Sequence, residues 1–215
     1  MFIEQPARFL RWIYPHAIWR MDPSVKAVYL TFDDGPIPQA TPFILDTLAH
    51  YGIHATFFVV GDNVRKYPEL FRRLIAEGHR VGNHTYNHIG GLRWLSVNYL
   101  RNTQKAQEVM DGLMDENLRI NHPPLFRPPH GWMRPLQYRI IRRQGYRIVM
   151  WDLVTRDYSR RLTAADVVNN VRRYARPGSI ITFHDSLRSI DKLQTALPES
   201  LEWLIGQGYA FNLFD

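Results

Sequence analysis

Two adjacent carboxylates, Asp33 and Asp34, follow an apolar run that has the composition of a buried strand. A glycine and a proline come next and end that strand abruptly, as they do at turns. Neighbouring carboxylates at a strand end repel each other and lose hydration unless a cation or a proton lies between them. The pair therefore predicts chemistry, with one carboxylate as a hard metal ligand and the other free to act as a base.

A pair of histidines, His84 and His88, offers partners for a metal ion fifty residues further along the chain. A helical turn would place both imidazoles on one side, because residues four apart share a helix face. Imidazole is the commonest ligand for zinc and related ions. Alone the pair is a weak signal, because exposed or core histidines show the same spacing and this chain has nine histidines. Together with Asp34 it predicts a site of two histidines and one carboxylate, with open positions for water.

The composition restricts both the fold and the chemistry. The chain has 215 residues, 45% of them hydrophobic, which is enough for the core of a single α/β domain. Because it contains no cysteine, disulfides, thiolate metal sites and cysteine nucleophiles are excluded. A chain without cysteine suits oxidising and reducing compartments alike.

The net charge of +7 comes mostly from arginine. Solvated helix faces are the simplest interpretation, and attraction to an anionic glycan or phospholipid surface is the alternative. A nucleic-acid partner is not expected, because no nucleic-acid-binding motif accompanies the charge. We also expect neither a spanning helix nor a secretory signal, since arginines and a proline interrupt the apolar residues of the N-terminus. A cytoplasmic or peripheral membrane location is therefore favoured.

Beyond residue 26, segments of strand length alternate with amphipathic segments of helix length. Strands are predicted at 28–31, 55–60, 80–83, 125–127, 147–151, 179–183 and 209–213, and helices at 41–51, 68–77, 96–116, 134–144, 164–175 and 193–206. This alternation predicts one parallel sheet in a single domain, either open and doubly wound or closed as a barrel. Such sheets place their active sites at the carboxyl ends of the strands. Five residues able to do chemistry follow these strands: Asp33, His84, Arg127, Asp157 and His184.

The N-terminal residues 1–25 precede the alternating pattern, and we expect them to form an extension of a catalytic domain at 26–215. Their aromatic and aliphatic side chains are mixed with arginines, a combination that suits a membrane interface. The interpretation that we favour is that these side chains pack on the barrel or fill its bottom.

Five short motifs occur in an order and spacing that are highly specific as a set. They are Thr31-Phe32-Asp33-Asp34-Gly35, His84-Thr85-x-x-His88, Arg127-Pro128-Pro129-His130-Gly131, Asp157, and His184-Asp185. Together they resemble the polysaccharide deacetylase family, the chitooligosaccharide deacetylase homology domain of carbohydrate esterase family 4. The resemblance runs from about residue 26 to the C-terminus and implies a distorted (β/α)7 barrel.

The resemblance implies a hydrolase that removes an N-acetyl group from an amino sugar of a poly- or oligosaccharide. A divalent metal ion would be held by Asp34, His84 and His88, with Zn²⁺ expected first and Co²⁺ or another transition ion as alternatives. This ion would activate a water molecule at neutral pH. Asp33 would be the base that removes the proton of that water.

The remaining motif residues would complete the reaction. Arg127 would orient the base through a charge-assisted pair, and the backbone N–H of His130 would stabilise the oxyanion. The imidazole of His130 would face either substrate or solvent. His184 would protonate the leaving amine, with Asp157 as its anionic partner.

The chain departs from the family pattern around the implied acyl pocket. Val154 and Tyr158 stand where the fourth motif usually has aspartate and tryptophan, and Thr182 stands where the fifth usually has leucine. Tyr158, Thr182 and Phe183 are expected to contact substrate in a more polar or differently shaped pocket. Because a methyl group in an apolar pocket is worth only about 1–3 kcal/mol, preference for acetyl over other acyl groups does not follow.

Two alternative functions remain open. Deacylation or deformylation of a lipid-linked amino sugar at a membrane surface would use the basic, apolar N-terminus. A non-catalytic carbohydrate-binding relative would keep the barrel but need neither base nor acid, so the presence of Asp33 and His184 argues against it. A non-haem iron oxygenase would share the ligand set, but the alternating pattern of strands and helices argues against it.

Overall fold

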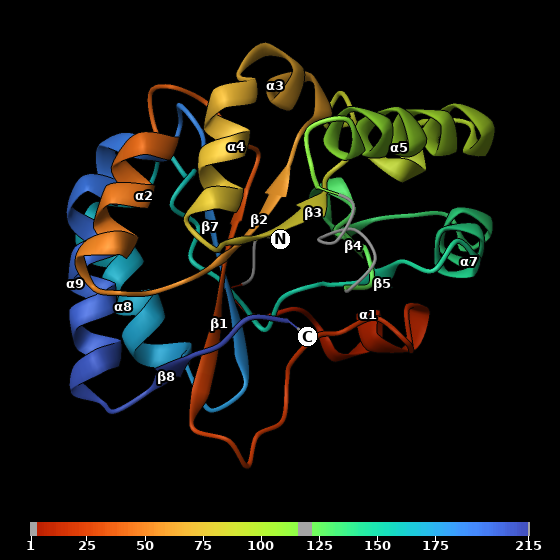
Figure 1. Ribbon diagram of the computed structural model, residues 1–215. Helices are drawn as coiled ribbons and strands as arrows, with labels where there is room; N and C mark the ends of the chain where they lie inside the picture. The colour runs from red at the N-terminus through yellow and green to blue at the C-terminus, as the bar shows by residue number, and fades with distance from the viewer. Residues whose placement is uncertain (1–3, 116–121, 215) are drawn as a thin grey trace.

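The computed structural model describes residues 4–115 and 122–214 and shows one parallel sheet with helices around it (Figure 1). The sheet has the strand order β5-β4-β3-β2-β1-β7-β6, and β8 pairs with the start of β1. The strands are β1 Ala27–Asp33, β2 Thr56–Val59, β3 Arg80–Asn83, β4 Leu125–Phe126, β5 Arg147–Ile148, β6 Leu153–Val154, β7 Ser179–His184 and β8 Ala210–Phe211. The α-helices are α1 Arg8–Ile13, α2 Thr41–His50, α3 Gly61–Lys66, α4 Pro68–Ala76, α5 Ser96–Asp111, α7 Pro135–Arg143, α8 Ala164–Tyr174 and α9 Ile190–Gly206.

All seven predicted strands are present, and the predicted α/β fold class is confirmed. One strand was not predicted. β6 follows β5 after only four residues and without an intervening helix, so the strict alternation of strands and helices fails there. The predicted helix at 96–116 corresponds to α5, which ends at Asp111, and its expected last residue lies outside the described residues.

The short link between β5 and β6 requires the sheet to curl. These two strands form opposite edges of the sheet, yet only four residues separate them in sequence. A flat sheet of seven strands would hold its edges roughly 29 Å apart, whereas five residue steps reach about 17 Å. The sheet therefore closes on itself as a distorted barrel. The two edge strands, β5 and β6, are not hydrogen-bonded to each other. The barrel is closed there by the four residues that link them.

An N-terminal segment lies across this break in the barrel. Ile18 forms an isolated parallel bridge with Val149, and the backbone N–H of Met21 donates to Gly178 next to β7. The Tyr14 hydroxyl donates to the carbonyl oxygen of Met133 at 2.7 Å and lies 2.8 Å from its backbone nitrogen, which donates in return. Residues on both sides of the break are thus tied to the same short stretch of chain.

Alternation along the strands separates two apolar cores. On β1, Val28, Leu30 and Phe32 pack against the helices, whereas Tyr29 packs inside the curl with Phe214. This follows from the strand period of two, which sends neighbouring side chains to opposite faces. The same alternation directs Asp33, the last residue of β1, to the inside of the barrel at its carboxyl end.

Candidate metal centre and active site

Asp33 is held at the end of β1 by a fully buried arginine. The guanidinium of Arg127 donates from Nη1 to Asp33 Oδ1 at 2.6 Å and to Thr31 Oγ1 at 2.8 Å. Its other nitrogens donate to the carbonyl oxygens of Val149 and Met150. A buried charge is tolerated when it is paired and hydrogen-bonded in this way. Arg127 therefore fixes the carboxylate of Asp33 and also braces the chain that follows β5.

Asp34 points away from that pair because the chain turns sharply after β1. Its backbone has φ 84°, a left-handed conformation that aspartate tolerates better than most residues. The amide of Asn63 donates to the carbonyl oxygen of Asp34 at 2.8 Å and stabilises the turn. The next residue must be glycine, because a Cβ on Gly35 would lie 2.0 Å from Asp185 Oδ2. The carboxylates of Asp33 and Asp34 thus point in different directions, and only that of Asp33 contacts Arg127.

The two histidines lie on a loop and not on the helical turn that their spacing suggested. His84 directly follows β3, while Thr85 and His88 both have positive φ. The loop is held by side chains, because Asn102 Oδ1 accepts from the backbone N–H groups of Tyr86 and Asn87. The shared side of the two imidazoles therefore comes from a side-chain-braced loop.

Asp34, His84 and His88 converge, with one ligand atom from each within 4.8 Å of the others. The Nε2 atoms of His84 and His88 lie 3.7 and 3.1 Å from Asp34 Oδ1. Donors bound at about 2.0–2.2 Å to a tetrahedral ion lie roughly 3.4 Å apart. The spacing of this group therefore fits a metal ion.

The protonation of the group also fits a cation. Nδ1 of His84 lies 2.7 Å from the carbonyl oxygen of Arg127, so it carries the proton and leaves the Nε2 lone pair facing Asp34. Burial lowers the pKa of His84 to about 4 despite the nearby carboxylates. Burial opposes ionisation of Asp34, but the hydrogen bond from His88 and the charges of the nearby histidines outweigh it and lower its pKa. A carboxylate oxygen faces an imidazole lone pair, an arrangement that a metal ion stabilises.

His184, on the last position of β7, lies directly beside Asp33, because the two residues are paired in the register of β1 and β7. Its Nδ1 lies 2.8 Å from Asp157 Oδ1, and its backbone N–H donates to Asp157 Oδ2 at 2.7 Å. Burial favours the neutral imidazole, but the charge and hydrogen bond of Asp157 and the charges of Asp34 and Asp33 outweigh it. They raise the pKa of His184 to about 9. His184 is therefore a cation at neutral pH.

The four residues expected to contact substrate are placed differently from one another. The Tyr158 ring meets the His184 ring edge-on at 4.6 Å, and the His130 ring lies 4.9 Å from that of His88. Thr182 is buried below the site, with its hydroxyl 3.0 Å from that of Thr31. Phe183 is not brought to the site. It is fully buried on the helix side of the sheet and stacks on Phe32.

Some residues that shape the site carry no motif signal. Asn63 holds the turn at Asp34, and Asn102 holds the histidine loop. Trp151 packs against Gly131, where a Cβ would lie 2.4 Å from its ring. Glu4 accepts from Arg156 Nη1 at 2.6 Å, which ties the N-terminal segment to the residue before Asp157. Of these residues, only Trp151 could have been singled out from the sequence, because it is the last residue of a predicted strand.

A hollow of about 280 Å³ lies beside His130 and is lined by Gly90, Leu92, Arg93, His130 and Trp132. It combines one cation with aromatic and aliphatic surface next to the metal-binding group. A larger cavity of about 690 Å³ is lined in part by Arg80, Val81 and Leu125, at the beginnings of β3 and β4. That cavity lies at the opposite ends of these strands from the site.

Comparison with known proteins identifies relatives of this chain and of its fold. Residues 20–149 match the polysaccharide deacetylase family. A peptidoglycan-N-acetylglucosamine deacetylase from Bacillus cereus is 32% identical over 91% of this chain and 90% of its own length. A crystal structure of a peptidoglycan N-acetylglucosamine deacetylase superposes with a TM-score of 0.86 at 30% identity, covering 95% of this chain and 94% of that one.

A carbohydrate esterase family 4 pseudoenzyme from Bacillus anthracis is also similar in structure. Its TM-score is 0.80 at 26% identity, with 92% of this chain and 66% of that chain covered. The same fold therefore occurs with and without activity, and function must be argued from the side chains at the site.

Proposed function

Because the chain belongs to the polysaccharide deacetylase family, we propose that it is a metal-dependent hydrolase that removes the N-acetyl group from an amino sugar of a glycan. The observation that supports this most is the arrangement around the Asp34, His84 and His88 group. A carboxylate, Asp33, and a cationic imidazole, His184, stand beside this group on paired positions of adjacent strands. Hydrolysis of an amide needs a base and an acid that act on the two sides of one carbon atom.

When bound, a divalent ion supplies an acidified water molecule and polarises the acyl carbonyl. Asp34, His84 and His88 would hold it, and the neutral nitrogen ligands with one carboxylate suit Zn²⁺ better than Mg²⁺ or Ca²⁺. We propose Zn²⁺ as the ion of this site.

Asp33 accepts the proton of the attacking water in the proposed reaction. Its Oδ1 is held by Arg127 at 2.6 Å. This ion pair holds the Asp33 carboxylate in one orientation and prevents its rotation. A base held in the attack geometry avoids the entropy loss of being positioned during each turnover.

His184 donates a proton to the departing amine as the C–N bond breaks, so that acetate and a free amino sugar are released. Its Nδ1 is engaged by Asp157, which leaves Nε2 as the nitrogen that carries the transferred proton. The raised pKa keeps this proton in place at neutral pH, and the edge-on contact with Tyr158 limits rotation of the ring.

For the substrate, we propose a glycan containing N-acetylglucosamine. The hollow beside His130 offers the Trp132 ring for stacking on a sugar face and Arg93 for a carboxylate or phosphate on a neighbouring unit. The Bacillus cereus relative is named for N-acetylglucosamine in peptidoglycan, which makes such polymers the first substrates to examine.

The test is acetate release from chitin oligomers and peptidoglycan fragments by Zn²⁺-loaded protein. We expect release by the natural sequence, none after chelation, and recovery on adding Zn²⁺. Asp33→Asn should bind Zn²⁺ normally yet lose at least about 100-fold in kcat. His84→Ala should lose both Zn²⁺ binding and acetate release. Full activity of His84→Ala in chelator would refute the proposed mechanism.

The pseudoenzyme relative motivates a second candidate, a non-catalytic glycan-binding protein. It predicts that glycans bind without acetate release and that Asp33→Asn leaves their affinity unchanged. Zn²⁺-dependent release from any of the oligomers would eliminate this candidate.

A further inference from the structure

Helix α1 presents an apolar stripe that no other described part of the chain covers. Leu10 and Tyr14 point inward and pack on the core that contains Tyr138. Phe9, Trp12 and Ile13 point outward, and the Trp12 side chain is 83% exposed. Residues at positions i, i+3 and i+4 form one face of a helix, so these three side chains make a continuous stripe.

A second exposed apolar group lies on the loop after the metal-binding histidines. Leu92, Trp94 and Leu95 are exposed on this loop, and Val97 in the first turn of α5 and Leu136 at the start of α7 are exposed as well. Exposed hydrophobic residues are ordinary when scattered, but here they are concentrated. Of the large hydrophobic side chains exposed in the described residues, only Val25, Leu187 and Ile205 lie outside these two groups.

The two groups belong to one side of the molecule. The ring of Tyr14, next to α1, lies 5.2 Å from that of Tyr138 in α7. Near its N-terminus α7 contacts the loop, because Arg134 donates to the carbonyl oxygen of Leu92 and Gln137 donates to that of Gly91. Figure 1 shows α1, α7 and α5 stacked on one side, opposite α2, α8 and α9.

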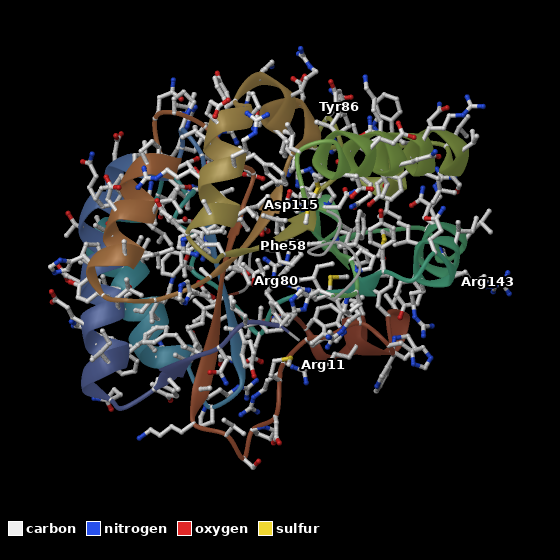
Figure 2. All side chains as sticks on the ribbon, in the orientation of Figure 1. Arg11, Phe58, Arg80, Tyr86, Asp115 and Arg143 are labelled. Atoms are coloured by element: carbon white, nitrogen blue, oxygen red, sulfur yellow. The ribbon has the colours of Figure 1, made fainter. Side chains whose placement is uncertain are left out.

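This side is also basic. Residues 5–21, 84–107 and 122–151 contain no aspartate or glutamate, and the acidic residues of α5 are confined to its last turn. Arg139, Arg142 and Arg143 on α7 are exposed. Figure 2 shows Arg143 extending away from the body of the molecule. The exposed arginines of α7 therefore lie on the same side as the apolar stripe, whereas Arg11 of α1 is paired with the buried Asp152.

We propose that this side, formed by α1, α7, the loop at 91–95 and the first turn of α5, docks on the surface of an anionic phospholipid bilayer. Tryptophan and phenylalanine enter the headgroup boundary and arginines meet lipid phosphates, a combination typical of interfacial helices. An anionic glycan would match the arginines and offer a sugar face to Trp12, but it has no apolar phase for the aliphatic side chains of Ile13, Leu92 and Leu95. The loop also carries Leu92, which lines the hollow beside His130, so docking would bring that hollow to the headgroup level.

The experiment is co-sedimentation of the full chain with vesicles, carried out with and without about one third phosphatidylglycerol in phosphatidylcholine. We expect binding to the anionic vesicles that weakens as salt is raised, since charges are screened beyond about 8 Å at physiological ionic strength. Each arginine near such a surface contributes roughly five-fold in partitioning. Arg139→Glu/Arg142→Glu/Arg143→Glu should therefore lose about 100-fold or more. Phe9→Ala/Trp12→Ala should lose at least about ten-fold.

Matched controls come from the other side of the molecule. Arg160→Glu/Arg161→Glu/Arg172→Glu changes three exposed arginines by the same charge, and Val25→Ala/Ile205→Ala trims two exposed apolar side chains that lie outside both apolar groups. Both should bind like the natural sequence, with unchanged thermal unfolding in every variant. The proposal is overturned if the natural sequence stays in the supernatant, if the controls lose as much as the docking variants, or if Phe9→Ala/Trp12→Ala binds normally. Because the readout is binding to lipid, the result does not depend on whether the protein deacetylates glycans.

Discussion

At the residue scale, each side chain of the site has a partner that sets its state. Arg127 holds the Asp33 carboxylate in place, and Asp157 stabilises the protonated form of His184. The carbonyl oxygen of Arg127 selects the tautomer of His84. The strand-end positions of these residues follow from the sequence. The pairs of Arg127 with Asp33 and of Asp157 with His184 were expected from the family resemblance and are present, whereas the contact that sets the tautomer of His84 was not predicted.

The pH dependence of the proposed reaction follows from His184. The acid must be protonated, and its pKa of about 9 means that activity should fall as the pH rises through 9. Asp157→Asn removes the charge that raises this pKa, so the fall should begin at lower pH. The measurement is kcat/KM against pH for the Zn²⁺-loaded protein. Superimposable alkaline limbs for the two proteins would contradict the role given to Asp157.

Arg127 should also be the most costly arginine to replace. Arg127→Met leaves Asp33 as an unpaired buried charge and two carbonyl oxygens without their donor. Removing one partner of a buried pair costs about 3–5 kcal/mol in the free energy of unfolding. Arg143→Met, at an exposed position, should change it by less than about 0.5 kcal/mol. Urea denaturation measures both, and equal effects would show that the buried network is not stabilising.

At the element scale, the turns after the strands decide the geometry of the site. The turn after β1 sends Asp33 and Asp34 to different partners, and the loop after β3 brings His84 and His88 together through backbone with positive φ. The sequence predicted both segments as strand ends, but it suggested a helical turn for the histidines. Spacing of four residues has no unique conformation, and the side chain that braces the loop, Asn102, lies on α5.

Alternation explains why Phe183 is not at the site although it directly precedes His184 of the last motif. Neighbouring residues of a strand face opposite sides. Since His184 faces the inside of the barrel, Phe183 must face the helices, where it stacks on Phe32. Proximity in sequence to an acid is therefore a poor guide to substrate contact within a strand.

Gly35 gives a test at this scale. In Gly35→Ala the new Cβ would lie 2.0 Å from Asp185 Oδ2, so the buried Asp185 carboxylate, which accepts a hydrogen bond from Thr41, would have to move next to His184. We expect loss of stability of about 1–3 kcal/mol, together with weakened Zn²⁺ affinity. Gly206→Ala is the control, because nothing lies within 4 Å of its Cβ and alanine is favoured in a helix by about 0.5–1 kcal/mol. Unchanged unfolding and Zn²⁺ affinity in Gly35→Ala would mean that the turn tolerates displacement.

At the scale of the whole molecule, the barrel is closed by chain connectivity and by the N-terminal segment. The break between β5 and β6 lies next to Val149 and Met150, whose carbonyl oxygens accept from Arg127. The segment that covers the break is therefore coupled to the base of the proposed reaction. We expect the N-terminal residues and the barrel to unfold together.

Tyr14→Phe tests this coupling. It removes the hydroxyl that donates to the Met133 carbonyl and accepts from its N–H in a buried setting. Loss of a buried partner of this kind costs about 1–3 kcal/mol. Unfolding followed by tryptophan fluorescence and by circular dichroism should shift together. A separate early transition would instead show that the N-terminal segment unfolds alone, and Tyr209→Phe serves as the control.

The sequence by itself determined the alternation of strands and helices, and with it the edge of the sheet at which Asp33, Asp34, His84, Arg127 and His184 meet. It did so because strand and helix periodicities are local properties that apolar spacing records. Tertiary structure alone decided the closure of the barrel between β5 and β6, the contacts of Arg127 with the carbonyl oxygens of Val149 and Met150, and the placement of an apolar stripe on α1 on the same side as the arginines of α7. These features depend on contacts between residues far apart in the chain, and no local pattern encodes them.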